Sequence, residues 1–194
     1  MNLLAKINGL FFFGFLSLLC AWHANVKANL GIAFSSGQGI HDIIPYRVAV
    51  SWDFGAIVRE EDLWGLNATW ENSFAVWNGP KRPDLAPHRV TDLNAATTGP
   101  MLRWQRRHPF VGTQVTPYAE LGVGVSWLSK TEIEGRILSL HFQFEDKGGI
   151  GMRMGKKQQY DVAVRAYHYS NASIKRPNSG VNLAMMSFGI WFPG

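Results

Sequence analysis

The sequence predicts an all-β protein, an eight-stranded antiparallel up-and-down transmembrane β-barrel. Apolar and polar residues alternate with period two along most of the chain, as in strands that bury one face. Connections rich in Gly, Pro and Asn interrupt this alternation. Charged residues recur on the polar faces of several strands, and a small closed barrel with an apolar outside and a hydrogen-bonded polar interior accounts for both faces. A soluble periplasmic sandwich, which would also alternate, is the alternative fold.

Composition limits the class of protein. The 194 residues are 46% hydrophobic, 17% charged and 13% aromatic, which excludes a disordered chain or a nucleic-acid-binding tail. A mean hydropathy of −0.06, with no central apolar run of about 18 residues, excludes a helical membrane bundle. Twenty glycines and eight tryptophans are typical of a β-rich chain with tight turns and interfacial aromatic residues.

Residues 1–28 have the features of a signal peptide. Lys6 gives a positive n-region, 10–19 form a short apolar h-region, and Val26 and Ala28 are small residues at the −3 and −1 positions of a cleavage site. A transmembrane anchor, or lipid attachment at Cys20, fits less well, because the run is short and no small residue precedes the cysteine. The domain expected at 29–194 then has no cysteine. It has 17 basic and 14 acidic residues, and this small positive excess does not indicate a nucleic-acid partner.

Eight strands are expected near 29–36, 45–56, 63–77, 90–104, 114–129, 136–147, 158–170 and 181–192. The second alternates most clearly, and the fifth and sixth repeat its pattern. The sixth would turn Phe142 and Phe144 outward and place His141 and Glu145 together in an interior network. The last ends in the aromatic residues Trp191 and Phe192, which, with the signal peptide, favours the outer membrane of a Gram-negative bacterium.

Topology assigns the connections to two sides of the membrane. In a barrel with an even number of strands and periplasmic ends, the odd strands run outward. The connections around 81–82, 130–136 and 175–176 are therefore expected outside, and those around 59–62, 103–108 and 147–157 in the periplasm.

The seventh strand ends with two polar residues on its apolar face. That face comprises Tyr160, Val162, Val164, Ala166, His168 and Ser170. If it faces lipid, His168 and Ser170 lack water near the extracellular end and require a functional explanation. Residues two apart on a strand have Cα atoms about 6–7 Å apart, which lets an imidazole accept a serine proton. Alone, a His-x-Ser tripeptide is also compatible with an interfacial polar pair.

The stretch 167–180, Tyr-His-Tyr-Ser-Asn-Ala-Ser-Ile-Lys-Arg-Pro-Asn-Ser-Gly, resembles the signature of the PagL-type lipid A 3-O-deacylases. The similarity extends more loosely to 117–124 and 142–145. It implies an eight-stranded outer-membrane barrel, without a cofactor, that removes the 3-linked acyl chain of lipid A at a lipid-facing site. It further implies that Ser170 is the nucleophile, His168 the general base, Asn171 and Asn178 oxyanion-hole residues, and Gly180 the residue that permits the turn.

One position departs from the family pattern. The family's third catalytic residue is typically an acid twelve positions after the serine, where this chain has Asn182. Its parity puts Asn182 on the outer face of the last strand, next to the seventh. An amide oxygen can accept a hydrogen bond from imidazole Nδ1–H but adds no negative charge, so slower hydrolysis is expected. Loss of activity is the other outcome.

Four loop cations are candidates for binding the phosphates of lipid A, or are simply solvated: Lys81, Arg82, Lys175 and Arg176. No metal or nucleotide motif is present. We therefore predict a serine esterase (a carboxylic-ester hydrolase) acting on lipid A. The alternatives are a non-catalytic barrel that binds or stabilises lipopolysaccharide, and a periplasmic binding sandwich. The sequence leaves the oligomeric state open, a homodimer included.

Overall fold

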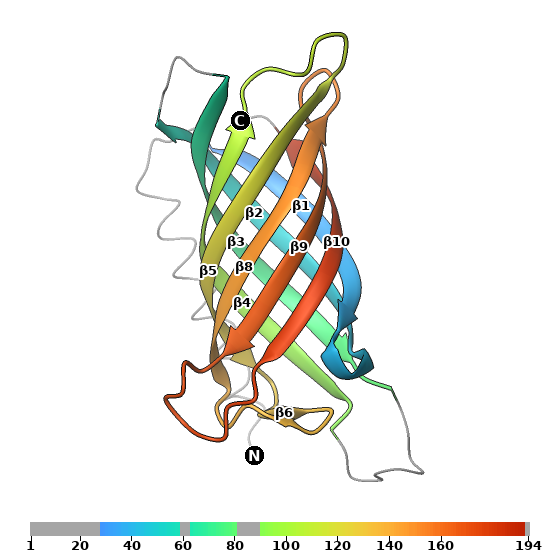
Figure 1. The fold of residues 1–194 in the computed structure, drawn as a ribbon, viewed down its shortest axis with the longest axis vertical. Helices are drawn as coiled ribbons and strands as arrows, with labels where there is room; N and C mark the ends of the chain where they lie inside the picture. Colours follow the sequence, from blue (N-terminus) through green and yellow to red (C-terminus); the bar gives the residue numbers. More distant parts are fainter. Residues whose placement is uncertain (1–27, 59–62, 81–89, 193–194) are drawn as a thin grey trace.

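The computed structural model describes residues 28–58, 63–80 and 90–192, and nearly all of the expected signal peptide lies outside them. Eight long strands form one closed antiparallel barrel, in which the first strand pairs with the last (Figure 1). They are β1 (Asn29–Gly39), β2 (Ile44–Val58), β3 (Trp64–Asn78), β4 (Asp92–Arg106), β5 (Val115–Leu128), β8 (Phe142–Met154), β9 (Tyr160–Ser170) and β10 (Val181–Phe192). The barrel confirms the predicted fold class and rules out the sandwich.

Three short elements lie at one end of the barrel, the lower end in Figure 1. They are the 3-10 turn η1 (Ile40–Asp42) and the two-stranded hairpin of β6 (Glu132–Ile133) and β7 (Arg136–Ile137). The connections β1–β2, β3–β4, β5–β8 and β9–β10 share this end, because consecutive strands are antiparallel. The structure thus groups the connections as predicted, although 59–62 and 81–89 lie outside the described residues. Among those described, no helix is long and apolar enough to cross a membrane.

The alternation sorts side chains as the sequence predicts. On β2, Tyr46 and Val48 are exposed while Arg47 and Asp53 are buried, and β5 and β9 repeat this pattern. Large apolar side chains consequently cover the outside of the barrel, including Phe34, Phe74, Leu121, Val123, Ile150, Val164, Met186 and Phe188. An exposed apolar belt around a polar interior is the arrangement that a barrel needs in lipid.

The sixth long strand was predicted wrongly. It was expected at 136–147, whereas β8 starts at Phe142 and continues to Met154. The apolar residues just before it belong to the hairpin connection, where Leu138 is fully buried. The glycines at 148, 149 and 151 look like a connection but lie in the strand, since a Cβ at Gly149 would be 2.5 Å from the Val164 carbonyl oxygen. The other seven strands were predicted to within three residues at each end.

His141 is a second correction. The shifted start of β8 leaves it outside the strand and exposed, stacked on Trp127 with ring centroids 5.5 Å apart. Its Nδ1 lies 2.6 Å from the Leu128 carbonyl oxygen. The predicted interior network therefore contains Glu145 without His141.

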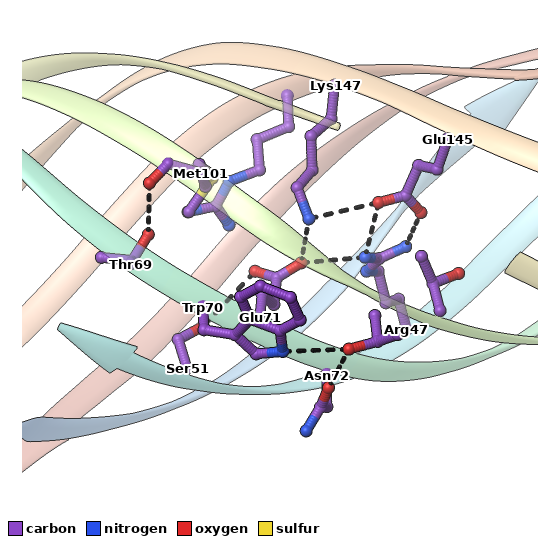
Figure 2. A network of polar contacts seen from close by, with 12 residues as sticks. Arg47, Ser51, Thr69, Trp70, Glu71, Asn72, Met101, Glu145 and Lys147 are labelled. Atoms are coloured by element: carbon purple, nitrogen blue, oxygen red, sulfur yellow. Dashed lines mark hydrogen bonds and ion pairs between the residues drawn. The ribbon is translucent and has the colours of Figure 1, made fainter. Parts of the chain in front are cut away.

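Two charge-balanced clusters fill the interior. In the Arg47 cluster (Arg47, Glu71, Glu145 and Lys147), two cations face two carboxylates, as Figure 2 shows. Arg47 Nη1 is 2.7 Å from Glu145 Oε2, and Lys147 Nζ is 2.8 Å from Glu71 Oε1. Nearer the other end, the Arg103 cluster comprises Asp53, Arg103, Glu120, Arg153, Asp161 and Arg165. Each charge of these two clusters thus has an opposite charge beside it, which offsets its desolvation.

An apolar mouth cluster closes the barrel at the hairpin end. It comprises Ile43, Ala75, Trp77, Leu93, Ala95, Leu128, Ile133, Leu138, Tyr167, Tyr169, Val181, Leu183 and Met185. Ile133 and Leu138 come from the β5–β8 connection and are fully buried. This connection is therefore part of the packed structure, and the site described next lies beside it.

Candidate active site

The end of β9 presents His168 and Ser170 on the outside of the barrel. His168 is exposed and Ser170 half-buried, while the intervening Tyr169 and the preceding Tyr167 are buried inside. The Tyr169 hydroxyl donates to Glu145 Oε2 at 2.5 Å and accepts from Arg47 Nη1 at 2.9 Å. This buried anchor fixes the residue between the histidine and the serine, so both outer side chains project from a rigid strand.

The structure brings Asn182 to His168. The two residues pair across β9 and β10, and His168 Nδ1 is 2.6 Å from Asn182 Oδ1. An amide oxygen only accepts hydrogen bonds, so Nδ1 carries the proton in this contact. In the neutral ring, Nε2 is then the unprotonated nitrogen, which is the one that a general base uses.

Gly180 ends the β9–β10 connection against the histidine ring. Its φ of +60° is in the left-handed region that favours glycine. A Cβ at this position would be 3.1 Å from His168 Cε1 and 3.7 Å from Nε2. The turn therefore lies close to the edge of the ring that carries the free nitrogen.

The two asparagines of the connection have different environments. Asn171 is fully buried, and its amide donates to the carbonyl oxygens of Leu138 at 2.8 Å and Lys175 at 2.9 Å. Both side-chain hydrogens of Asn171 are thus used, one on its own connection and one on the β5–β8 connection. Asn178 is half-buried, and its Oδ1 accepts from the Asn171 backbone N–H at 3.3 Å, so its NH₂ group points elsewhere.

A groove of about 650 Å³ lies in the outer surface beside His168 and Asn182. Its floor is a row of small residues on neighbouring strands, Gly148, Ala166 and Ala184, which the strand pairing places side by side. Without large side chains, this row is recessed below the apolar belt. The groove is therefore a surface on which a narrow apolar chain can lie next to the imidazole.

The sequence reasoning missed one acidic residue here. Asp146 pairs with His168 from β8, is exposed on the same outer face and lines the groove. The acids of β5 and β9, Glu120 and Asp161, are buried inside the barrel and so do not share this outer face. Continuing the parity of Phe142 and Phe144 by one step would have found Asp146, which lies within the predicted strand 136–147, but the outer face was followed only as far as Phe144.

The predicted loop cations are placed only in part. Lys175 and Arg176 are exposed in the β9–β10 connection, on the same side as the site, whereas Lys81 and Arg82 lie outside the described residues. Within the described ranges, no group of three or more His, Cys, Asp or Glu side chains could hold a metal ion.

Comparisons with known proteins agree with this architecture. The family model described as lipid A 3-O-deacylase (PagL) matches residues 44–191. Two relatives are each named lipid A deacylase PagL. The relative from Pseudomonas aeruginosa is 28% identical over 158 residues, which cover 81% of this chain and 80% of the relative. The relative from Bordetella bronchiseptica is 27% identical over 197 residues, which cover 99% of this chain and 100% of the relative. A crystal structure of the outer membrane enzyme PagL superposes with a TM-score of 0.71 at 25% identity, covering 82% of this chain and 98% of that one.

Proposed function

Because the chain belongs to the lipid A 3-O-deacylase (PagL) family, we propose that it removes the 3-linked acyl chain of lipid A. It is a β-barrel enzyme of the outer membrane and a hydrolase. The observation that carries the proposal is the His168–Asn182 hydrogen bond on the lipid-facing surface, two residues along β9 from Ser170. A polar pair in this setting needs a function.

The proposed reaction is a serine esterase cycle. His168 Nε2 accepts the Ser170 proton while Oγ bonds to the ester carbonyl carbon. The tetrahedral intermediate then breaks its bond to the sugar oxygen, which takes the proton from His168. Water next attacks the acyl-enzyme with His168 again as base, which releases a hydroxy fatty acid and restores Ser170.

Asn182 orients the imidazole in this proposal. Its oxygen holds the Nδ1–H and keeps Nε2 free, but it adds no charge to stabilise the imidazolium that forms. Asp146 is the carboxylate that the strand pairing sets across His168 on the other side, with Cβ atoms about 4.5–5.5 Å apart in such pairs. We assign it a through-space contribution that partly replaces the missing acid.

For the oxyanion, Asn178 is the donor that fits best. Its Oδ1 is occupied by the Asn171 N–H, and its NH₂ group is free to point at the developing negative charge. Asn171 acts indirectly, because both of its side-chain hydrogens hold loop carbonyls. We therefore propose that Asn171 shapes the loop and does not itself donate to the oxyanion.

The substrate would lie with its 3-linked acyl chain in the groove over Gly148, Ala166 and Ala184. Lys175 and Arg176, exposed on the loop above, would contact the phosphates, with Lys81 and Arg82 as the other two candidates. A homodimer is a separate proposal, which sedimentation in detergent tests.

A barrel that binds lipopolysaccharide without cleaving it is the second candidate, favoured by Asn182 in place of an acid. Mass spectrometry of lipid A from Gram-negative cells that express the chain separates the two. The proposal predicts lipid A that lacks one hydroxyacyl group in cells with the natural chain, and intact lipid A in cells with Ser170→Ala. Intact lipid A in both, with heat-modifiable gel mobility showing a folded barrel, would favour the binding protein.

A further inference from the structure

The loop that carries the candidate oxyanion residue rests on the β6–β7 hairpin connection. The Ser179 backbone N–H donates to the Ile137 oxygen at 2.9 Å, and Ser139 Oγ donates to the Pro177 oxygen at 2.6 Å. Asn171 adds the bond to the Leu138 oxygen already described. These contacts link both ends of the β9–β10 connection to the hairpin connection.

The hairpin is itself fixed to the barrel. Ile133 and Leu138, on its two sides, are fully buried in the mouth cluster, and Glu134 N donates to the Val90 oxygen at 2.8 Å. A short hairpin with apolar side chains packed at both ends has little freedom to move. It can therefore act as a platform against which the neighbouring loop is set.

Arg136 projects from this platform to the turn beside the histidine. Its Nε donates to the Gly180 oxygen at 2.9 Å, and its Nη2 donates to the Ser179 oxygen. A guanidinium presents its donors in a rigid planar fork, so two neighbouring carbonyls are held in one geometry. Gly180 in turn lies against the His168 ring, where even a methyl group would be 3.1 Å from Cε1.

From this chain of contacts we infer that Arg136 is a positioning residue for the proposed hydrolysis. It holds the Ser179–Gly180 turn against His168, so that the ring stays between Asn182 and Ser170 while the proton moves. The inference rests on the proposed function. It separates Arg136 from the candidate phosphate-binding cations, because its guanidinium is engaged with loop carbonyls.

Kinetics on purified barrels with lipid A as substrate test this role. Displacing a reacting group by about 1 Å can cost about a hundredfold in rate, so Arg136→Ala should lower kcat by about tenfold to a hundredfold with little change in KM. Arg136→Lys keeps the charge but loses the planar fork, and should lose about threefold to tenfold. Lys130→Ala is the matched control, because it removes another cation of the same connection, one that pairs with the exposed Asp92. It should retain the natural rate.

Two kinetic results would overturn the inference. One is an unchanged kcat in Arg136→Ala. The other is a raised KM in Arg136→Ala that Arg136→Lys restores fully, which would indicate a phosphate-binding cation. If Arg136→Ala does not fold, Arg136→Lys decides by its kcat.

A second readout keeps this inference distinct from the proposed function. NMR of the folded barrel in micelles should show shifted His168 ring and Gly180 amide signals in Arg136→Ala and unshifted ones in Lys130→Ala. Unshifted signals in Arg136→Ala would overturn the inference whatever the activity. Shifted signals in a barrel that leaves lipid A intact would support the positioning contact while the proposed function fails.

Discussion

Asn182 is the residue at which this site departs from the family pattern. Its amide oxygen holds the Nδ1 side of His168 at 2.6 Å, where an acid would add a negative charge. In the proposed reaction, orientation and charge stabilisation are thus separate contributions: the Asn182 hydrogen bond provides the first, and Asp146, across the strand, provides part of the second. Each contribution can be tested alone.

Asn182→Ala should lower the rate of lipid A deacylation by about tenfold to a few hundredfold, because the ring loses its orienting acceptor while the base remains. Asn182→Glu should preserve or raise the rate, since a carboxylate stabilises the imidazolium. Initial rates of fatty acid release measure both. An Asn182→Ala enzyme as fast as the natural chain would show that the hydrogen bond has no catalytic role.

Gly180→Ala tests the turn against the ring. Alanine is strained at a φ of +60°, and its Cβ would be 3.1 Å from His168 Cε1, so the turn or the ring must shift. We expect a drop in kcat of about tenfold or more with a folded barrel, by analogy with other small displacements of reacting groups. A natural kcat in this variant would mean that the contact does not constrain the ring.

The two faces of strand β8 use glycine for different reasons. Gly148 faces outward onto the groove, where a Cβ would be 2.9 Å from the flexible end of Leu121 and in ordinary contact, at 3.6 Å, with the Glu120 backbone oxygen. Gly149 faces inward, where a Cβ would be 2.5 Å from the Val164 backbone oxygen of β9. Glycine thus keeps the groove open at position 148 and allows close pairing of β8 with β9 at position 149.

Substitutions at these two glycines should separate function from folding. Gly148→Leu fills the groove with a side chain that lipid tolerates, so we expect a normally folded barrel with strongly reduced deacylation. Gly149→Ala should instead lower the folded fraction seen by heat-modifiable gel mobility. If Gly148→Leu retained full activity, the acyl chain would not lie in the groove.

The sequence predicts which side chains share a face of a strand, but it does not predict the contacts between distant parts of the chain. The parity of β9 and β10 puts His168, Ser170 and Asn182 on one outer face, because side-chain direction depends only on position along a strand. The start of β8 and the hairpin before it could not be predicted in this way. Leu138 and Ile133 alternate like strand residues, but they are buried by packing in the mouth cluster, which is made by distant parts of the chain.

Over the whole molecule, the two interior clusters fix the cross-section of the barrel on which the site stands. Arg47 joins β2 to β3 and β8 through Glu71 and Glu145 (Figure 2). The Tyr169 hydroxyl, which accepts from Arg47, connects the same cluster to β9. The outer site and the inner network therefore share strand β9. Stability and activity are expected to depend on different faces of it.

Glu71→Gln should destabilise the barrel without touching the site. It leaves Arg47 and Lys147 with one carboxylate between them, and breaking a buried ion pair typically costs about 3–5 kcal/mol. Urea unfolding in lipid vesicles measures the loss. Lys130→Ala, which breaks an exposed pair, should change the free energy of unfolding by less than about 1 kcal/mol. Equal effects of the two substitutions would contradict the view that the interior network supports the fold.

In the proposed reaction Ser170, with His168 as base, hydrolyses lipid A on the lipid-facing surface of this barrel. The most direct measurement incubates the purified, folded barrel with lipid A and quantifies both products by mass spectrometry. The natural chain should yield 3-O-deacylated lipid A and an equal amount of hydroxy fatty acid, and Ser170→Ala and His168→Ala should yield neither. Product formation by either folded variant, or none by the natural chain, would contradict the account.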